Sequence, residues 1–477
     1  MLHLKKIYRR IIMEKSANEQ LQERLTFTPK NGALHMSQDE IKQAQDFNEG
    51  YKTFLNNSKT ENLCVLTVIE MAKKHGYEEF IPGNVYAPGK KLYVNNRGAA
   101  VMLCTIGKNS LESGLRIVAS HIDSPRLDLK PNPLYEESEI AYLKTHYYGG
   151  IKKYQWPTIP LALHGIVYKS DGEMVRISIG EDENDPVFCI TDLLPHLGRE
   201  QAKKVLSEAF QGESLNIIIG TLPENDDKIK DKTKFAILKI LHEKYGITEV
   251  DFKTADIKAV PSFKARDIGF DRSLVASYGH DDRVCAYTSI MADFETKAPD
   301  YTTVAILADK EEIGSVGNTG LDSNFFLYFV KELADAKGEK VNRVLRNSKA
   351  LSADVNAAFD PGFADVYDKR NCVNVNYGIA IAKYVGSGGK GGTVDASAEY
   401  MSFVTRLLNK NNVLWQIGEL GKVDAGGGGT VAKFLAAFDM DIVDIGVPVL
   451  SMHAPVEIVS KIDVYMTYKA FRAFYEV

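Results

Sequence analysis

Cysteine is scarce in this sequence. Only five cysteines occur in 477 residues, and no two of them form a Cys-x-x-Cys pair. An odd, scattered set argues against a disulfide framework and against a thiolate zinc site. We therefore expect free thiols in a reducing cytoplasm, and any bound metal would have to be held by His, Asp and Glu. The five are Cys64, Cys104, Cys189, Cys285 and Cys372.

Long apolar runs and a strong charge of either sign are also missing. No run approaches the roughly 18 residues that a membrane span needs, and the formal net charge is only -5. This balance gives no reason to expect nucleic-acid binding or a basic membrane-binding patch. We expect neither a nucleic acid nor a membrane among the partners.

The N-terminal stretch MLHLKKIYRRIIMEKS is basic, and Lys and Arg interrupt its apolar residues. It has no continuous apolar core and no small-residue cleavage site, so it does not resemble a signal peptide. Two interpretations stay open. The stretch forms a short amphipathic basic helix, or the chain starts at Met13 and does not need its first twelve residues.

Length and pattern predict two domains, because 477 residues exceed one ordinary core. Helical periodicity over 40–75 gives way, after about residue 130, to a turn-rich region of short strands with one helical stretch at 198–210. After Pro261, apolar runs alternate with helical segments, which is typical of an α/β fold with a mostly parallel sheet covered on both faces. The predicted domains are a discontinuous catalytic domain, 1–130 plus 260–477, and an inserted β-rich domain, 131–259.

Polar residues follow four of the apolar runs and open one helix. In an open α/β sheet, ligands bind outside the carboxyl ends of the strands, so these positions are candidate site residues. Taken singly, each is equally typical of a turn, a helix cap, a solvated charge or a buried histidine. The candidates are His121 with Asp123, Glu311 with Glu312, Asp354, His453, and the helix-opening pair Asp281 and Asp282.

Taken together, these residues indicate a catalytic metal site. Two histidines and at least three carboxylates gather at one predicted edge without any cysteine, which suits zinc, manganese or cobalt. Five ligands suit two metals that share a carboxylate and clamp a bridging hydroxide, at a separation of about 3.5–4 Å. One of two adjacent glutamates can then ligate while the other acts as general base. Asp123 is placed to accept the second imidazole N–H of His121.

Five motifs carry a resemblance to a known family. In order, they are SHIDSPRLDLKP, GHDDR, DKEEIGS, LSADVNAAFDP and SMHAPVEIVSKIDV. Together they resemble the co-catalytic zinc aminopeptidases, specifically the aspartyl aminopeptidase and vacuolar aminopeptidase I family, over nearly the whole chain after about residue 35. The resemblance implies a zinc-exopeptidase-like catalytic domain, an inserted dimerisation domain, and assembly into a tetrahedral dodecamer. The reaction it implies is removal of the N-terminal residue from peptides with a free α-amine.

The resemblance also implies residue roles. His121 and Asp354 are the expected ligands of one metal, Glu312 and His453 those of the other, and Asp281 bridges them. Glu311 is the expected general base, and Asp123 the residue that orients His121. Lys390 resembles a lysine near the substrate, and His196 a histidine that reaches a neighbouring subunit's active site; a solvated loop lysine and a surface histidine are the competing interpretations. Zn²⁺ is the expected metal, with Mn²⁺ or Co²⁺ as alternatives, and acidic and neutral first residues are both open.

Three other functions compete with this one. A phosphate-binding loop at Gly386–Thr393 fails because Gly391, not Ser or Thr, follows Lys390. A related two-metal hydrolase, such as a deacylase or carboxypeptidase, has the same ligands and differs only in its substrate. A non-catalytic assembly protein would not need the general base, yet Glu311 is present.

Overall fold

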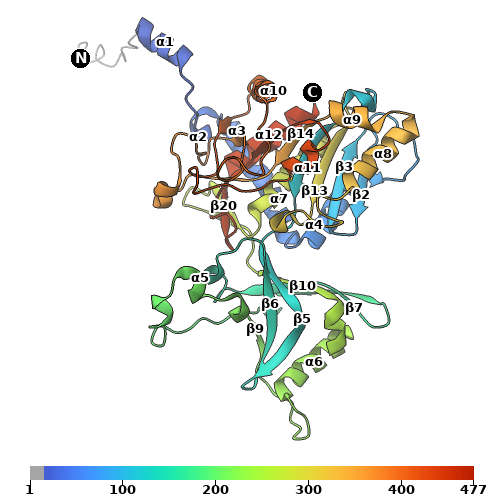
Figure 1. Ribbon diagram of the computed structural model, residues 1–477, viewed down its shortest axis with the longest axis vertical. Helices are drawn as coiled ribbons and strands as arrows, with labels where there is room; N and C mark the ends of the chain where they lie inside the picture. Colours follow the sequence, from blue (N-terminus) through green and yellow to red (C-terminus); the bar gives the residue numbers. More distant parts are fainter. Residues whose placement is uncertain (1–14) are drawn as a thin grey trace, which may run out of the picture.

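Three β-sheets organise the chain, which the computed structural model describes over residues 15–477. Figure 1 shows the largest sheet, with its helices, in an upper body and a second sheet in a lower body. The chain enters the lower body through β5 and returns from it through β10. The interpretation of residues 1–14 as a basic helix or a dispensable start lies outside the described residues.

The largest sheet forms the core of the upper body. Its four central strands, β13, β4, β14 and β18, are mutually parallel, whereas β2–β3, β3–β13 and β18–β16 pair antiparallel. The sheet is therefore mixed, with its parallel part at the centre. In spatial order its strands are β1 (Glu78–Glu79), β2 (Lys91–Asn96), β3 (Ala100–Thr105), β13 (Thr303–Ala308), β4 (Arg116–His121), β14 (Lys349–Ala353), β18 (Asp441–Gly446), β16 (Ile379–Ala382) and β17 (Trp415–Ile417).

Alternate residues of the central strands pack into two separate apolar clusters. Val118 and Ala305 join one cluster with residues of α3, α4, α7, α10 and α12, while Ile117 and Val304 join another with residues of α8, α9 and α11. This period of two is what a strand with both faces buried produces. The helices are α3 (Gln38–Asn57), α4 (Glu61–Lys74), α7 (His280–Glu295), α8 (Phe325–Lys337), α9 (Val341–Asn347), α10 (Ala398–Lys410), α11 (Ala432–Ala436) and α12 (Lys461–Tyr475).

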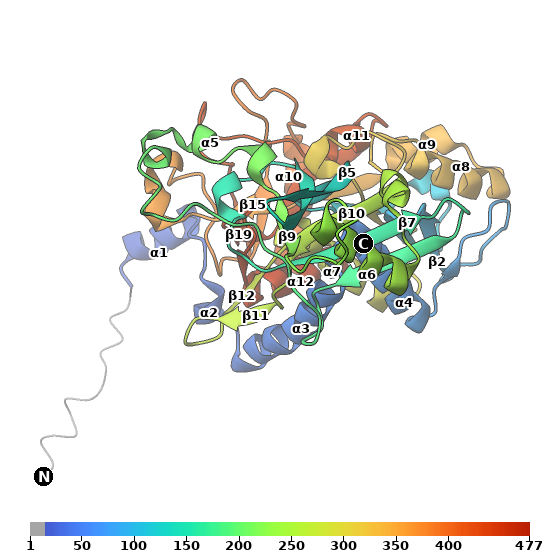
Figure 2. The ribbon, with the colours of Figure 1, turned by 90° about the horizontal axis from the view of Figure 1, so that it is seen from below.

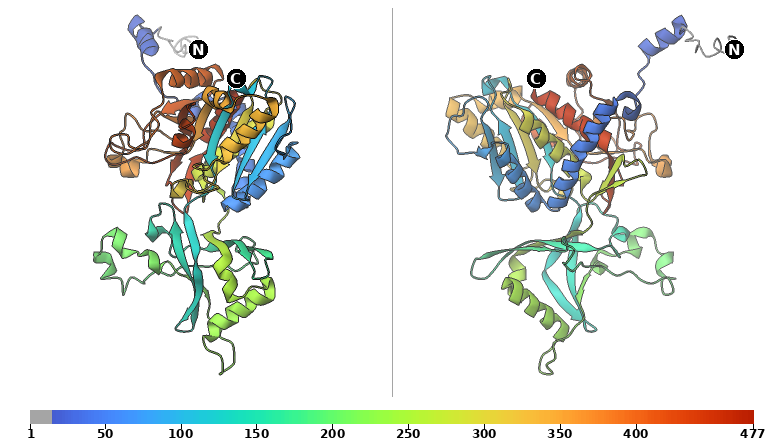
Figure 3. Two further views of the ribbon diagram at one scale, coloured as in Figure 1. Left: turned by 45° about the vertical axis from the view of Figure 1, so that its right-hand side comes forward. Right: turned by 180° about the vertical axis from the view of Figure 1, so that it is seen from behind.

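The lower body contains a six-stranded antiparallel sheet with its own apolar cluster. Figure 3 shows this sheet as a separate layer beneath the first, with α6 (Lys232–Tyr245) packed on it. In spatial order the strands are β8 (Met174–Ile179), β7 (Leu161–Tyr168), β10 (Ala255–Pro261), β5 (Arg126–Glu137), β6 (Ile140–Tyr148) and β9 (Ile217–Gly220). The sheet thus runs from Arg126 to Pro261, slightly beyond the predicted insert at 131–259.

A small third sheet lies beside the ligand edge of the first. Its strands are β11 (Arg266–Ile268), β12 (Leu274–Ser277), β20 (Glu457–Ser460), β19 (Pro448–Leu450) and β15 (Asn356–Ala357). β12 leads directly into α7, and the turn between β19 and β20 carries His453. This sheet therefore brings two distant parts of the sequence to one place.

One secondary-structure prediction for the insert was wrong, and one helix was not predicted. The helical stretch predicted at 198–210 contains only a short 3-10 turn, Gln201–Lys203, and one turn of helix, α5 (Leu206–Ala209). None of its residues in these turns is buried, so no packing stabilises a longer helix. The longest helix of the insert, α6, was not predicted.

The first described helix, α1 (Ala17–Leu25), stands apart from the two bodies. It has no buried residue, and Figure 2 shows it projecting from the upper body. The short helix α2 (Gly32–His35) follows it and is the first element with a buried residue, Gly32. None of the helices within 15–477 combines the length and the apolar character that a membrane crossing requires.

Candidate metal centre

His121 ends strand β4 and points into the ligand edge of the sheet. It stands in register with Ala308 at the end of β13, so the residues that follow both strands converge. The imidazole is buried, with its Nε2 3.1 Å from Asp281 Oδ1 and its Nδ1 3.2 Å from Asp123 Oδ1. One ring nitrogen therefore faces the cluster, while the other faces the carboxylate predicted to orient it.

Asp281 lies between the two candidate histidines. It opens α7 behind Gly279, whose φ of 74° is a left-handed conformation that favours glycine. Asp281 Oδ1 lies 3.1 Å from His121 Nε2, and Asp281 Oδ2 lies 3.2 Å from His453 Nε2. Each oxygen of this buried carboxylate thus faces a different imidazole.

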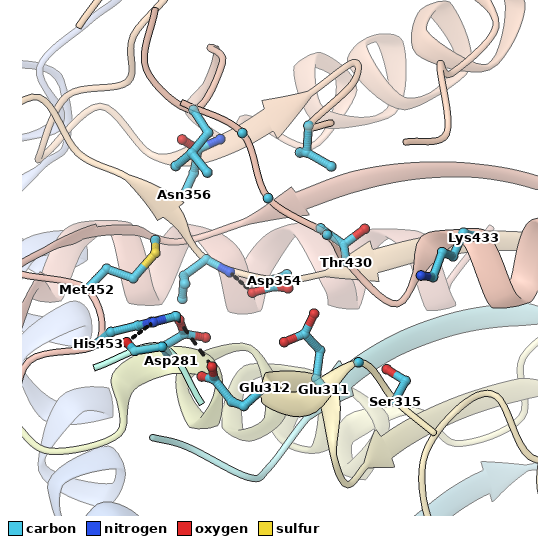
Figure 4. Close-up of a pocket in the computed structure, with 18 of the residues that line it drawn as sticks. Asp281, Glu311, Glu312, Ser315, Asp354, Asn356, Thr430, Lys433, Met452 and His453 are labelled. Carbon is cyan, nitrogen blue, oxygen red and sulfur yellow. Dashed lines mark hydrogen bonds and ion pairs between the residues drawn. The ribbon is translucent and has the colours of Figure 1, made fainter. Parts of the chain in front are cut away.

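Glu311 and Glu312 form a tight 3-10 turn just after β13. The backbone N–H groups of both residues donate to Asp123, one to each carboxylate oxygen, at 3.1 Å. The Glu312 carboxylate lies 3.5 Å from His453 Nε2, whereas that of Glu311 lies 3.9 Å from His121 Nε2. Figure 4 shows the two glutamates diverging, Glu312 toward His453 and Glu311 into the cavity.

Asp354 and His453 complete the cluster. Asp354 follows β14, and its Oδ1 lies 3.8 Å from His121 Nε2. His453 sits in the β19–β20 turn with a φ of 65°. Its Nδ1 hydrogen-bonds the Gly150 carbonyl at 2.8 Å, which leaves Nε2 directed at Asp281 and Glu312.

The carboxylates crowd one another in a buried space. Burial raises the pKa of Glu312 and of Asp354 well above the ordinary range, and nearby carboxylates raise them further. Burial also opposes ionisation of Asp281, but hydrogen bonds from His121 and His453 hold its pKa below the usual value. No Lys or Arg pairs with these carboxylates within residues 15–477. A cation at this position would relieve the repulsion.

The donor set fits divalent metals. Two groups of ligand atoms lie within 4.8 Å of one another: His121, Glu311 and Asp354, and His121, Asp281 and Glu312. Glu312 Oε1 is buried and has no hydrogen-bond partner among the described atoms. A buried oxygen without a partner destabilises the fold unless another group, such as a metal ion, binds to it. Imidazole and carboxylate donors without thiolate are those of catalytic zinc sites.

Comparison with known proteins decides the family. A family model described as aminopeptidase I zinc metalloprotease (M18) matches residues 54–475. The chain belongs to the M18 family. It is therefore a zinc-dependent metalloaminopeptidase, a hydrolase, which confirms the predicted resemblance and the predicted enzyme class.

Individual relatives support this assignment to the M18 family. A probable M18 family aminopeptidase 1 of Clostridium acetobutylicum is 49% identical over 443 residues, which cover 91% of this chain and 95% of that protein. The crystal structure of an M18 aminopeptidase from Thermotoga maritima superposes with a TM-score of 0.90 at 44% identity, covering 94% of this chain and all of that one. The mApe1 dodecamer of S. cerevisiae shares the fold, with a TM-score of 0.74 at 22% identity over 91% of this chain and 97% of that one.

The M18 site opens into a cavity of about 440 Å³. Its walls include Ser315, the glycine-rich stretch 427–429, Thr430 and Lys433. Figure 4 shows Lys433 across the cavity from His453, with its amino group directed inward. Sequence reasoning missed Lys433, although the run GGGGTVAK, which ends at it, could have marked a loop entering a helix.

Neither of the two predicted substrate residues, Lys390 and His196, lines this cavity. Lys390 pairs with Asp395 at 2.9 Å and lies over the Tyr384 ring at 3.8 Å, so its charge is already engaged. His196 is exposed in the insert, among loops that line no part of the cavity. Within a single chain, the structure therefore brings together the metal-site candidates but not Lys390 or His196.

Glu457, the first residue of β20, is a second feature of the M18 site that sequence reasoning missed. It stands opposite Ser277, and its buried carboxylate reaches both neighbouring loops. Oε1 accepts the His453 N–H at 2.6 Å, and Oε2 accepts the Asp281 N–H at 3.0 Å. The Glu457 side chain thus fixes, through hydrogen bonds, the backbone of both candidate ligands, Asp281 and His453.

Glu457→Gln should weaken metal binding. The glutamine has the same shape but only one acceptor oxygen, so its NH₂ would face a backbone N–H that needs an acceptor. We expect a roughly 10- to 100-fold loss of metal affinity, measured by competition with a coloured chelator. Glu399→Gln, at an exposed glutamate that opens α10, is the matched control. Equal affinity of the two variants would contradict this role of Glu457.

Proposed function

We propose that this chain removes the N-terminal residue of peptides with a free α-amine, at a centre that holds two divalent ions, most readily Zn²⁺ and otherwise Mn²⁺ or Co²⁺. His121 and Asp354 would hold one ion, Glu312 and His453 the other. Asp281 would bind both ions, and the geometry of its carboxylate is the main support for the proposal. Its two oxygens face two different imidazoles, at 3.1 and 3.2 Å, which is the arrangement that a bridging carboxylate needs.

Residues of the chain itself transfer the proton and position the groups that react. Two bound ions would polarise the scissile carbonyl and lower the pKa of the attacking water. Glu311 accepts the proton of that water and returns it to the leaving amine. Burial raises the pKa of the Glu311 carboxyl above its usual value, which makes the carboxylate a stronger base toward the attacking water. Asp123 fixes both the His121 ring and the turn that aims Glu311.

We infer a preference for acidic first residues over neutral ones. Lys433 is the cation that lines the cavity, and none of the ion pairs within the described residues includes it. A peptide held by its α-amine at the ions would place its first side chain in this cavity, where an Asp or Glu carboxylate can pair with the ammonium group.

Lys433→Met tests this preference. It keeps an unbranched side chain and removes the charge. We expect kcat/KM for substrates with an acidic first residue to fall roughly 10- to 100-fold, the value of a hydrogen bond to a charged group. The value for a leucyl substrate should stay the same. Lys390→Met is the matched control, and selective loss of acidic substrates in that variant instead would place recognition at Lys390.

We propose that the insert at 131–259 mediates assembly into an oligomer, and the S. cerevisiae relative mApe1 is described as a dodecamer. The segment around His196 exposes a group of leucines and valines that one chain alone does not cover: Leu193, Leu194, Leu197, Val205 and Leu206. Such a patch is typical of a protein–protein interface. In this assembly His196 would reach the active site of a neighbouring subunit. The five free thiols fit a cytoplasmic location.

Paired substrates test the reaction itself. The metal-loaded protein should hydrolyse a free dipeptide such as Asp-Ala and should leave its N-acetylated form intact, because only the free amine can bind at the ions. Turnover of the acetylated peptide at a similar rate would favour the deacylase or carboxypeptidase alternative. No turnover of either, with both metals bound, would favour a non-catalytic assembly protein.

A further inference from the structure

We propose that the inserted domain positions both imidazoles of the metal centre, through the Tyr148 hydroxyl and the Gly150 carbonyl. Tyr148 ends β6, the second strand of the insert, and Gly149 and Gly150 follow it directly. The inference rests on the proposed function, since it concerns the residues proposed to hold the ions. It adds that the domain proposed for assembly also builds part of the active site.

Tyr148 acts on His121 through Asp123. Its hydroxyl donates to Asp123 Oδ2 at 2.8 Å, and the other carboxylate oxygen lies 3.2 Å from His121 Nδ1. Asp123 is completely buried, so it cannot replace a lost hydrogen bond with one from bulk water. The same carboxylate accepts the N–H groups of the Glu311–Glu312 turn. A change in its orientation would therefore move an imidazole and the proposed base together.

The Tyr148 ring is itself fixed at the junction of the two bodies. Arg126, its cross-strand partner on β5, stacks on the ring at 3.8 Å. The same guanidinium lies 3.2 Å from Glu61 on α4, a helix of the upper body. A chain of contacts thus runs from the upper body through Arg126 and Tyr148 to Asp123, and the hydroxyl has one defined direction.

Gly150 acts on His453 directly. Its carbonyl accepts from His453 Nδ1 at 2.8 Å, which fixes the ring so that Nε2 faces Asp281 and Glu312. A Cβ on Gly150 would lie 3.2 Å from His453 Nδ1, so the close approach depends on glycine. Gly149 adopts a φ of 75°, and a Cβ there would lie 3.2 Å from Glu312 Oε2. The glycine pair lets the backbone of the insert reach the site.

Tyr148→Phe tests the first contact, because it keeps the ring on Arg126 and removes only the hydroxyl. We expect kcat to fall roughly 10- to 100-fold with little change in KM. The visible absorption spectrum of the Co²⁺-loaded protein should also change, because it reports the ligand geometry. Tyr142→Phe, on the same strand but stacked on Tyr135, is the matched control. The melting temperature of both variants separates a general loss of stability from a local effect.

Gly150→Ala tests the second contact. Its backbone φ is an ordinary one, so the substitution acts through the new methyl group against His453. We expect one of the two ions to be lost to a chelator faster than from the wild type, while the other is retained. Gly389→Ala, where a Cβ meets no atom within 4 Å, is the matched control.

The wild type is measured first, since the absence of metal-dependent hydrolysis there would overturn the proposed function. A working wild type, together with Tyr148→Phe and Gly150→Ala variants that match their controls in spectrum, kcat and metal retention, would overturn this inference alone.

Discussion

Glu311→Gln should abolish turnover while leaving the metal content unchanged. The substitution keeps the size of the side chain and removes the carboxylate that accepts the proton of the attacking water. General acid–base groups contribute roughly 10²- to 10⁴-fold, so a loss of kcat in this range is expected. Metal content would be measured by elemental analysis of dialysed protein, and kcat with an aspartyl dipeptide.

The control for this prediction is Glu332→Gln, an exposed glutamate on α8 that lines no part of the site. It should retain both full activity and full metal content. The competing role for Glu311 is that of a ligand, because its carboxylate clusters with His121 and Asp354. Loss of metal together with activity in Glu311→Gln would show that Glu311 is a ligand and not the base.

Asp281→Asn should weaken the binding of both ions. Asparagine keeps one oxygen, but its NH₂ group cannot ligate a metal. That group would face one of the two proposed ions, beside either His121 or His453. Each Asp281 oxygen faces a different histidine, so one ion would lose its oxygen ligand and the other would keep only a neutral amide oxygen in place of a carboxylate. We expect metal affinity to fall by at least about 100-fold, beyond the loss that follows removal of a supporting residue, and activity to fall with it.

Asp335→Asn, at an exposed aspartate of α8 that pairs with Lys331, is the matched control for this substitution. Both variants remove one negative charge, so a general electrostatic effect would appear in both. If Asp281→Asn retained one ion with normal affinity, Asp281 would belong to a single metal and the shared-carboxylate arrangement would be wrong.

The position of the candidate site was predictable because it follows from strand order. His121 and Asp354 end or follow neighbouring parallel strands, and the helix-opening Asp281 and the turn at Glu311 lie at the same edge. An apolar run that stops at a charged residue marks such a place in the sequence. The family was predictable for the same reason, since four of its five motifs follow apolar strands and the fifth opens helix α7.

Other features could not be predicted because they depend on contacts across the fold. In the sequence, Glu457 resembles any other strand residue. The pairing of β20 with β12 places it between His453 and Asp281. Lys390 and Lys433 both stand near glycine-rich runs, and a nearby acidic partner, Asp395, engages the first but not the second. Helix α6 has a weak apolar pattern in a turn-rich region, and its packing against the sheet of the insert stabilises it.

Besides the surface proposed for assembly, the insert supplies contacts to residues of the metal site. Tyr148, at the end of β6, contacts Asp123, and Gly150 just after it contacts His453; the exposed leucines around His196 lie in loops of the same domain. A subunit contact that moved β6 would therefore be transmitted to the metal centre. The assembly proposed for the insert and the activity of the metal centre would then depend on the same domain.

Metal titration measures directly whether the centre holds two ions that share Asp281. Protein stripped with a chelator would be titrated with Zn²⁺ while bound metal and hydrolysis of an aspartyl dipeptide are followed together. The account predicts that full activity requires two equivalents per chain, and that Asp281→Asn binds neither with normal affinity. Full activity at one equivalent, with no second ion bound, would contradict it.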